Sequence, residues 1–326
     1  MAVTDAFGRP ISYLRLSVTD RCDLRCFYCL PRDYRGFRPP ASWLTPSELA
    51  QAVAAFAELG VRHVRLTGGE PLVRSDLSTI ARHLSALPGI EELSLSTNAA
   101  RLESQAAALR AAGICRINAS LDSLDPATFA RITGGGDLNA VLRGLEAARQ
   151  AAMEPIKINM VMMRGINDHE AETMVEFCLE RGFTLRFIET MPIGSGGREA
   201  LNHYLDLEEI RQRLDRRFGL HPAAMRGSGP ARYYQVGDSS LVVGFITPLS
   251  QHFCASCNRV RMAVDGRLFL CLGEEADLDL NPLLRGGADQ QQLVAAIHAA
   301  LQRKPERHDF HQAPERIIRP MSALGG

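Results

Sequence analysis

The 326-residue chain has few aromatic residues, no excess of either charge and no long hydrophobic run. It contains one tryptophan, and its 37 Lys and Arg residues balance 37 Asp and Glu residues. Such a composition is not typical of a protein that coats nucleic acid or lies on a membrane surface. Asp5, Arg9, Arg15 and Asp20 interrupt the N-terminal region, so we draw no secretory signal there. No apolar run reaches membrane-spanning length, and we expect a cytoplasmic protein.

Eight cysteines are present, and six of them fall into two triplets. A disulfide framework does not suit them, because the cytoplasm keeps thiols reduced and a chain of this size needs no covalent cross-links to fold. The triplets are Cys22, Cys26 and Cys29, spaced C-x3-C-x2-C, and Cys254, Cys257 and Cys271, spaced C-x2-C with the third at longer range. The isolated Cys115 and Cys178 are predicted to be small buried hydrophobic residues.

Short β-rich runs alternate with longer helical patterns up to about residue 190, which is typical of strand–helix units around a parallel sheet. The predicted strands are Tyr13–Val18, His63–Thr67, Leu93–Thr97, Arg116–Leu121, Ile156–Met162 and Leu185–Glu189. The predicted helices are Pro46–Leu59, Asp76–Leu87, Leu102–Ala112, Ala140–Ala152, His169–Glu180 and, beyond the last strand, Leu207–Phe218. Six strands predict an α/β fold with a partial, TIM-like (β/α)6 barrel rather than a closed eight-stranded one.

Beyond Gly194 the alternation weakens, Gly- and Arg-containing stretches appear at 194–198 and 226–232, and we expect a smaller, β-rich C-terminal domain. The predicted division places the barrel in residues 1–200 and the second domain in residues 201–326. Within the second domain, Asp265-Gly266 lies between two β-rich runs and is a strong hairpin signal. The hairpin would return the chain to the other two cysteines of the second triplet.

Five predicted strands carry polar residues at spacing two, alternating with apolar neighbours. The polar sets are Arg15 and Ser17, Arg65 and Thr67, Ser94 and Ser96, Arg116 with Asn118 and Ser120, and Lys157 with Asn159. Spacing two places each set on one face of its strand, whereas an ordinary barrel interior is filled by Val, Ile and Leu. We interpret these faces as the lining of a basic lumen that suits a multiply charged anion. For any single strand, the alternative is a face turned to solvent or to a nearby carboxylate.

Each cysteine triplet is one ligand short of a complete four-iron cluster. Such a cluster normally has four protein ligands, so three cysteines leave one iron open to a substrate or cofactor. Zinc is the alternative at both places. The first triplet could hold zinc with a distant fourth ligand, and the second could form a Cys3His site with His252.

The first triplet, with Tyr28 before its last cysteine, resembles the signature of radical S-adenosylmethionine enzymes. Thr67-Gly68-Gly69-Glu70-Pro71 is similar to the glycine-rich motif with which that superfamily contacts the methionine part of its cofactor. Within the superfamily, the resemblance extends nearly end to end to the GTP 3',8-cyclases of molybdenum cofactor biosynthesis. It is carried by LRLSVTDRC at 14–22, RLTGGEPL at 65–72, RINASLD at 116–122, RFIE at 186–189, FCASCNRVR at 253–261 and the terminal Gly325-Gly326.

This resemblance implies a lyase that converts GTP to (8S)-3',8-cyclo-7,8-dihydroguanosine 5'-triphosphate with S-adenosylmethionine and two [4Fe-4S] clusters. Both triplets would ligate clusters, and the open iron of the second would face the nucleotide base. The S-adenosylmethionine contacts implied by the family are Tyr28, Gly69, Ser120 and Met191. The implied GTP contacts are Arg15, Arg65, Ser96, Lys157, Asn258, Arg259, Val260 and Arg261. Gly325 and Gly326 would reach into the active site and take part in catalysis.

The family also suggests partners for the chain. A flavodoxin-like protein would donate electrons and cyclic pyranopterin monophosphate synthase would take the product, while a homodimer is compatible with the family. We expect no nucleic-acid or membrane partner. The chain departs from the family pattern at Ala99, where a glycine usually follows the Thr-Asn pair, and at Leu30, where methionine is frequent.

Two other functions compete with this interpretation. Another two-cluster radical enzyme, such as one that modifies a peptide, predicts additional cysteines near the C-terminus, and none follows Cys271. A non-catalytic zinc module that engages nucleic acid predicts a basic chain with exposed aromatic residues, whereas this chain is neutral.

Overall fold

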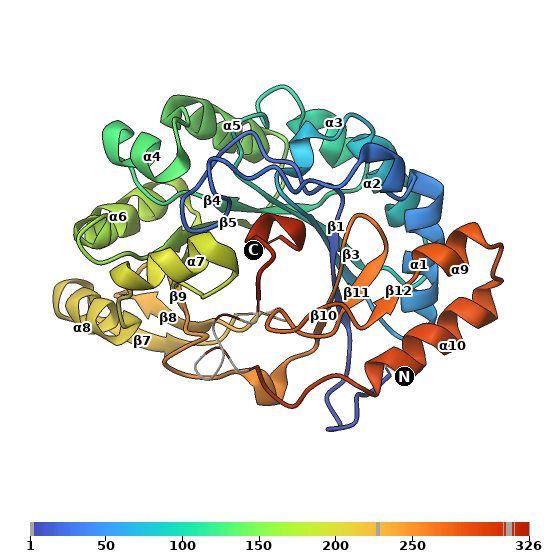
Figure 1. The fold of residues 1–326 in the computed structure, drawn as a ribbon. Coiled ribbons are helices and arrows are strands. Elements are labelled where there is room, and N and C mark those ends of the chain that lie inside the picture. The colour runs from blue at the N-terminus through green and yellow to red at the C-terminus, as the bar shows by residue number, and fades with distance from the viewer. Residues whose placement is uncertain (1–2, 226–228, 309, 311–314, 316, 326) are drawn as a thin grey trace.

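The computed structural model describes residues 3–225, 229–308, 310, 315 and 317–325, and in these residues the strands form one twelve-stranded sheet. Six parallel strands make its centre in chain order. They are β1 (Tyr13–Ser17), β2 (His63–Thr67), β3 (Glu92–Thr97), β4 (Arg116–Ser120), β5 (Ile156–Val161) and β6 (Thr184–Ile188). The sheet curves, and helices cover its outer face (Figure 1). This arrangement confirms the predicted α/β fold with a partial barrel.

The helices that follow these strands pack on the outside of the barrel. They are α1 (Pro46–Glu58), α2 (Leu77–Ser85), α3 (Ala106–Ala111), α4 (Pro126–Thr133), α5 (Leu138–Gln150) and α6 (Ala171–Arg181). Helix α1 shows how the local sequence sets a boundary: the Thr45 hydroxyl accepts a hydrogen bond from the backbone of Glu48, whose carboxylate accepts one from the backbone of Thr45. This capping box satisfies two backbone donors that a helix N-terminus leaves free.

The part of the chain after residue 200 adds strands to both edges of the six-stranded centre. Beside β6 lie β9 (Val242–Ile246), β8 (Arg232–Val236) and β7 (Leu220–Ala223), and beside β1 lie β10 (Arg259–Met262), β11 (Arg267–Phe269) and β12 (Leu278–Asp279). Strand β10 is parallel to β1 and antiparallel to β11, so the hairpin predicted around Asp265-Gly266 is present. Strands from both sides of residue 200 therefore share one sheet, and the division into two domains stays a prediction.

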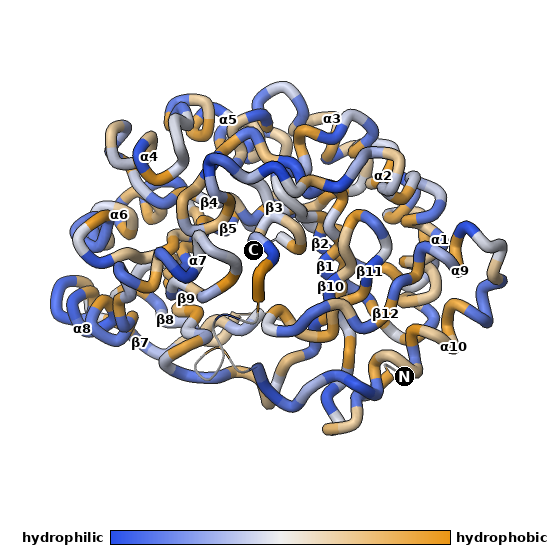
Figure 2. The backbone as a smooth tube through the Cα atoms, in the orientation of Figure 1, coloured by the Kyte–Doolittle hydropathy of each residue, from blue (hydrophilic) through white to orange (hydrophobic). Residues whose placement is uncertain are grey.

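The remaining helices follow the barrel. They are α7 (Gly194–Ala200), α8 (Leu207–Phe218), α9 (Asn281–Arg285) and α10 (Gln290–Leu301), with a short 3-10 turn, η6 (Met321–Ala323), near the C-terminus. Figure 2 shows hydrophobic and hydrophilic residues alternating along the outer helices, as expected for helices with one buried face. Within the described ranges, no helix combines the length and apolarity that crossing a membrane requires.

The hydrophobic core lies between the sheet and this outer layer of helices. Leu14 and Leu16 of β1 and Leu66 of β2 are fully buried in it, together with Phe56 of α1. Each such side chain contributes about 2 kcal/mol to folding by leaving water. The strand residues between these positions point to the other side of the sheet, where the candidate site lies.

Candidate active site

The first cysteine triplet lies in the loop that follows β1. The backbone N–H groups of Arg25 and Phe27 donate to carbonyls at the end of α4 (2.9 and 3.1 Å), which fixes the loop to the barrel. Burial raises the pKa of Cys26 well above its ordinary value and that of Cys29 to about 12. Metal binding requires thiolates, and the positive charge of a bound metal would stabilise the thiolate forms of these buried cysteines. The donor set therefore fits an iron–sulfur cluster.

Tyr28 of this loop is tied to the ends of two barrel strands. Its hydroxyl donates to Asp122 Oδ2 (2.7 Å), while Asp122 Oδ1 accepts from the backbone of Val161 (2.8 Å). Burial raises the pKa of Asp122 to about 6, although the hydrogen bond from Tyr28 acts in the opposite direction. The ring of Tyr28, which stands between Cys26 and Cys29 in the sequence, is thus held in a defined place.

The glycine-rich loop after β2 packs directly on the first-triplet loop. A Cβ atom on Gly69 would lie 2.1 Å from the Arg21 carbonyl oxygen, so only glycine fits this close approach. The carboxylate of Glu70 accepts from Thr97 Oγ1 (2.7 Å) and the backbone of Asn98 (2.6 Å), and burial raises its pKa to about 7. Glu70 therefore connects the ends of β2 and β3 beside the first triplet.

The loop after β3 explains one departure from the family pattern. Ala99 has a φ of 62°, in the left-handed region that glycine adopts without steric cost. Its carbonyl oxygen lies so close to α5 that a Cβ atom on Gly144 would approach it to 2.1 Å. Alanine therefore occupies a left-handed position in this loop, and glycine on the neighbouring helix permits the close approach of its carbonyl.

One cavity collects the cationic side chains of the strands. Its lining includes Arg15, Arg65, Arg116, Lys157, Asn159 and Arg186, together with the second cysteine triplet. Among the described residues, Arg116 is the only one of these cations with a carboxylate partner, Glu92 at 2.5 Å. Within the same described part of the chain, two nitrogens of Arg15 and the Nε atoms of Arg65, Arg116 and Arg186 are buried without a hydrogen-bond partner. A buried group of this kind is costly unless an anion pairs with it, so the cavity fits a polyanion.

The cations of this cavity also lower one another's pKa values, which favours their neutral forms. Burial lowers the pKa of Lys157 to about 7, with Arg186 and Arg116 adding to the effect. Burial followed by the charge of Arg261 lowers the pKa of Arg15. A bound anion would reverse both effects because it stabilises the charged forms.

The second cysteine triplet lies at the edge of this cavity. Cys254 begins a 3-10 turn, η5 (Cys254–Ser256), in which the Cys257 N–H donates to the Cys254 carbonyl (3.0 Å), and Cys271 follows β11. Burial acts to raise the pKa of Cys257, but Arg259 and Lys304 outweigh it and lower the pKa to about 7. The thiolate of Cys257 is therefore supported by nearby cations.

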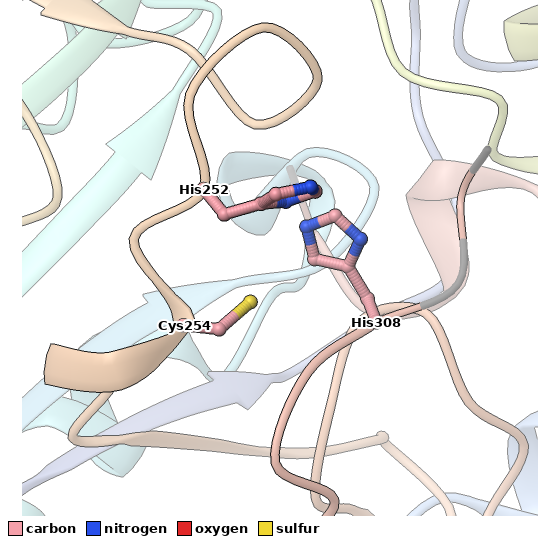
Figure 3. Close-up of side chains that lie close together, drawn as sticks. All are labelled: His252, Cys254 and His308. Atoms are coloured by element: carbon pink, nitrogen blue, oxygen red, sulfur yellow. The ribbon is translucent and has the colours of Figure 1, made fainter.

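Two histidines lie beside Cys254. Figure 3 shows the rings of His252 and His308 close to the Cys254 thiol, and the potential ligand atoms of these three residues lie within 4.8 Å of one another. Thiolate and imidazole donors also suit zinc, so both an iron–sulfur cluster and zinc fit the donors at this place.

The C-terminal segment enters the barrel (Figure 1). The Gly325 carbonyl accepts a hydrogen bond from Arg261 Nη1 (2.6 Å). Gly325 has a φ of 68°, and a Cβ atom there would lie 2.0 Å from Thr67 Oγ1. Ser322 of the same segment provides a backbone hydrogen bond to Cys29. The segment thus bridges the first triplet and the cavity, while Gly326 lies outside the described residues.

The other predicted site residues occupy several positions. Arg259 and Arg261 of β10 line the cavity, whereas Val260 between them is buried in the hydrophobic core on the opposite face. The Asn258 side chain donates to Ser12 Oγ (3.0 Å). Met191 lines the cavity, Ser120 is exposed at the end of β4, and Ser96 is half-buried outside the cavity lining.

Sequence reasoning missed several lining residues, among them Tyr13, Arg186, Tyr233 and Lys304. Arg186 had a visible signal, because it is a charged residue inside the apolar strand β6. Of the isolated cysteines, Cys178 is buried as predicted and Cys115 is only partly buried.

Comparisons with known proteins agree with this geometry. Residues 16–178 match the Radical SAM superfamily, and residues 183–310 match the family described as Molybdenum Cofactor Synthesis C. A GTP 3',8-cyclase from Paracoccus denitrificans is 47% identical over 99% of this chain and 95% of its own length. GTP 3',8-cyclase 2 from Pseudomonas aeruginosa is 46% identical over 99% of this chain and 98% of its own length.

The fold also has a counterpart among solved structures. Streptococcus suis SuiB bound to S-adenosylmethionine superposes with a TM-score of 0.62 at 16% identity, covering 97% of this chain and 77% of SuiB. At this identity the likeness concerns the fold alone. The near full-length identity to the curated relatives decides the family: this chain belongs to the GTP 3',8-cyclases of the radical S-adenosylmethionine superfamily.

Proposed function

We propose that this chain converts GTP to (8S)-3',8-cyclo-7,8-dihydroguanosine 5'-triphosphate, the first step of molybdenum cofactor biosynthesis. The observation that carries the proposal is the cavity in which the second triplet shares one lining with cations whose buried nitrogens lack a hydrogen-bond partner among the described residues. GTP combines a polyanionic end with a base that offers nitrogen and oxygen donors to a metal. Both ends of such a molecule have suitable partners within this cavity.

The triphosphate would be held by the cations of the strands. Arg15, Arg65 and Lys157 line the cavity together with Arg259 and Arg261 of β10, where Arg261 is the register partner of Arg15. Guanidinium groups pair with phosphate oxygens in a bidentate manner, and this pairing removes the cost of leaving the groups buried alone. Ser96, Asn258 and the backbone of Val260 are proposed as the remaining contacts of GTP.

Cys22, Cys26 and Cys29 would hold one [4Fe-4S] cluster, and Cys254, Cys257 and Cys271 would hold a second. Together with S-adenosylmethionine, the first cluster supplies the one-electron chemistry that starts a radical reaction. The chain's own share is to place the reactants: Tyr28, Gly69, Ser120 and Met191 would contact S-adenosylmethionine. The bond between Tyr28 and Asp122 and the close packing at Gly69 support these contacts.

Gly325 and Gly326 would act at the boundary between the two halves of the site. The Gly325 carbonyl orients the Arg261 guanidinium, and its neighbour Ser322 reaches the first triplet. A tail in this place would position a phosphate-binding group and exclude water from the reacting atoms.

The remaining expectations are part of the same proposal. Residues 1–200 would form the radical domain and residues 201–326 the domain that carries the second cluster. A flavodoxin-like electron donor, cyclic pyranopterin monophosphate synthase as the next enzyme, a homodimer and a cytoplasmic location complete it.

Anaerobic incubation with GTP, S-adenosylmethionine and dithionite tests the activity, with the product mass measured. We expect a product with the mass of GTP, since cyclisation neither adds nor removes atoms, that separates from GTP in chromatography. Cys26→Ala is the matched control, because it should abolish turnover while GTP binding to the cationic cavity persists. Consumption of S-adenosylmethionine without any new nucleotide would contradict the proposal.

Metal analysis of the anaerobically purified chain distinguishes the second candidate, a zinc site at the second triplet. His252 and His308 beside Cys254 are the observation that favours zinc. Two clusters predict about eight iron and eight sulfide per chain, whereas zinc at the second triplet predicts about four of each and one zinc.

A further inference from the structure

Lys304 is a buried cation directly beneath the second triplet. It follows α10, is 2% exposed and lines the cavity. Its Nζ donates to the carbonyl of Arg259, two residues after Cys257 (3.0 Å), and to that of Leu270, adjacent to Cys271 (2.5 Å). The ammonium therefore touches the backbone of both segments that carry these two cysteines.

The chain segment around Lys304 is also fixed to Cys254, the remaining cysteine of the second triplet. Arg9 donates to the carbonyls of Cys254 (3.0 Å), Pro305 (2.6 Å) and Glu306 (2.7 Å). Arg9 has its own counter-ion, because its Nε lies 2.6 Å from Asp5 Oδ2. Two cations thus hold residues 304–306 against the triplet, and Arg9 already has a carboxylate partner.

Lys304 differs from Arg9 in this respect. Among the described parts of the chain, no carboxylate lies within ion-pair distance of Lys304, and its two hydrogen bonds go to neutral carbonyls. A buried ammonium without a counter-charge is strongly unfavourable. The anions that could compensate it are metal-bound thiolates of Cys257 and Cys271, which lie on the two segments whose carbonyls accept hydrogen bonds from Lys304.

The first triplet has different surroundings. Arg25 Nη1 donates to the carbonyl of Cys22 (2.6 Å), so a cation touches the cysteine backbone there as well. Carboxylates lie beside that triplet, because Asp23 Oδ1 is 3.9 Å from Cys22 Sγ and Tyr28 donates to Asp122 Oδ2 (2.7 Å). Lys304, by contrast, has no carboxylate within ion-pair distance in the part of the chain that the structure describes.

We propose that Lys304 is the counter-charge of the second triplet: a positioning residue that holds its metal-bound thiolates and favours the more negative oxidation state of the group bound there. The proposal rests on the function proposed above for the nature of that group. Lys304 would act through the cysteines and their backbone, without a bond to the metal or the substrate.

The test compares Lys304→Met, Lys304→Gln and Lys304→Arg with the wild-type chain, all reconstituted anaerobically with iron and sulfide. Iron and sulfide are counted, and iron release to a chelator is followed over time. For Lys304→Met and Lys304→Gln we expect iron release from the second cluster to accelerate about ten- to a hundredfold, the size of effect typical of groups that support metal ligands. The paramagnetic signal of the second cluster should appear at more negative potential, whereas Arg should behave like wild type.

The first cluster is an internal control in every variant, because its signal and its iron should not change. Glutamine retains hydrogen-bond donors without the charge. A Lys304→Gln variant with the iron release and reduction potential of the wild type would therefore overturn the proposal. Loss of both clusters together, with a lowered melting temperature in Arg as well, would show a purely structural role and overturn it too. Zinc, or no metal, at the second triplet of the wild-type chain would instead contradict the proposed function.

Discussion

Replacing Lys157 with methionine should abolish a proton uptake that accompanies GTP binding. In the empty cavity the pKa of Lys157 is lowered to about 7 by burial, Arg186 and Arg116, so the side chain is mostly neutral at higher pH. A bound triphosphate favours the ammonium and returns its pKa toward the ordinary 10.5. At about pH 8.5 the free chain lacks this proton and the complex holds it, so binding should take up close to one proton.

The same linkage sets the sign of the pH dependence. Below about pH 7 Lys157 is charged in both states and its protonation does not affect affinity. Above that pH, binding must include protonation, so affinity should fall by up to about tenfold per pH unit until the pKa of the complex is reached. Titration calorimetry in two buffers of different ionisation enthalpy gives the number of protons directly.

Lys157→Arg is the matched control, because a guanidinium stays charged and should bind GTP without uptake. Wild-type binding with no proton uptake at pH 8.5, or uptake that persists unchanged in Lys157→Met, would refute the assignment of Lys157 to the phosphate site.

Three further changes test the tail, the phosphate site and the barrel packing. Gly325→Ala places a Cβ atom 2.0 Å from Thr67 Oγ1, so turnover, followed as the product separated from GTP by chromatography, should fall at least about tenfold with iron content unchanged. Arg261→Ala should weaken GTP binding about ten- to a hundredfold in equilibrium dialysis and leave S-adenosylmethionine binding intact, and equal loss of both would count against its role. Gly144→Ala should lower the free energy of unfolding in urea by about 2 kcal/mol, because its Cβ meets the Ala99 carbonyl, whereas an unobstructed helix position would gain about 1 kcal/mol.

The barrel strands were predictable because each alternates apolar residues with polar ones. Strand β2 begins and ends as predicted, and the other five differ by one residue, at one end in four of them and at both ends in β6. The same alternation predicted that Arg15, Arg65 and Lys157 share one face, and they line one cavity. Period-two patterns survive in the structure because the two faces of each strand meet different surroundings.

Elements that depend on distant contacts were not predictable in this way. Residues 194–200 contain three glycines and lay outside every predicted helix, yet they form α7. Cβ atoms on Gly196 and Gly197 would lie 2.3 Å from the carbonyls of Phe27 and Met191, so the glycines let this helix lie against the first-triplet loop. Helix propensity is a weak local preference, and a close tertiary contact overrides it.

The lining of the second triplet shows the same limit. Lys304 and Arg9 stand in segments with no periodic pattern, and they are separated from each other by most of the chain. Only the folded arrangement brings both to the cysteines. Helix α4, in contrast, had local signals in Asp125-Pro126 at its start and Gly134 at its end, and these were overlooked.

The pairing of β1 with β10 has a consequence for biosynthesis. During translation the edge of β1 stays without its neighbour until the ribosome has made residues 259–262, so an incomplete chain presents unpaired backbone groups to other chains. Arg9 must also wait for residues 305 and 306 before the pocket around Cys254 closes. Insertion of the second metal group would therefore wait until residues 305 and 306 have been made, and a chain that stops before residue 259 should aggregate rather than accumulate as a half-loaded enzyme.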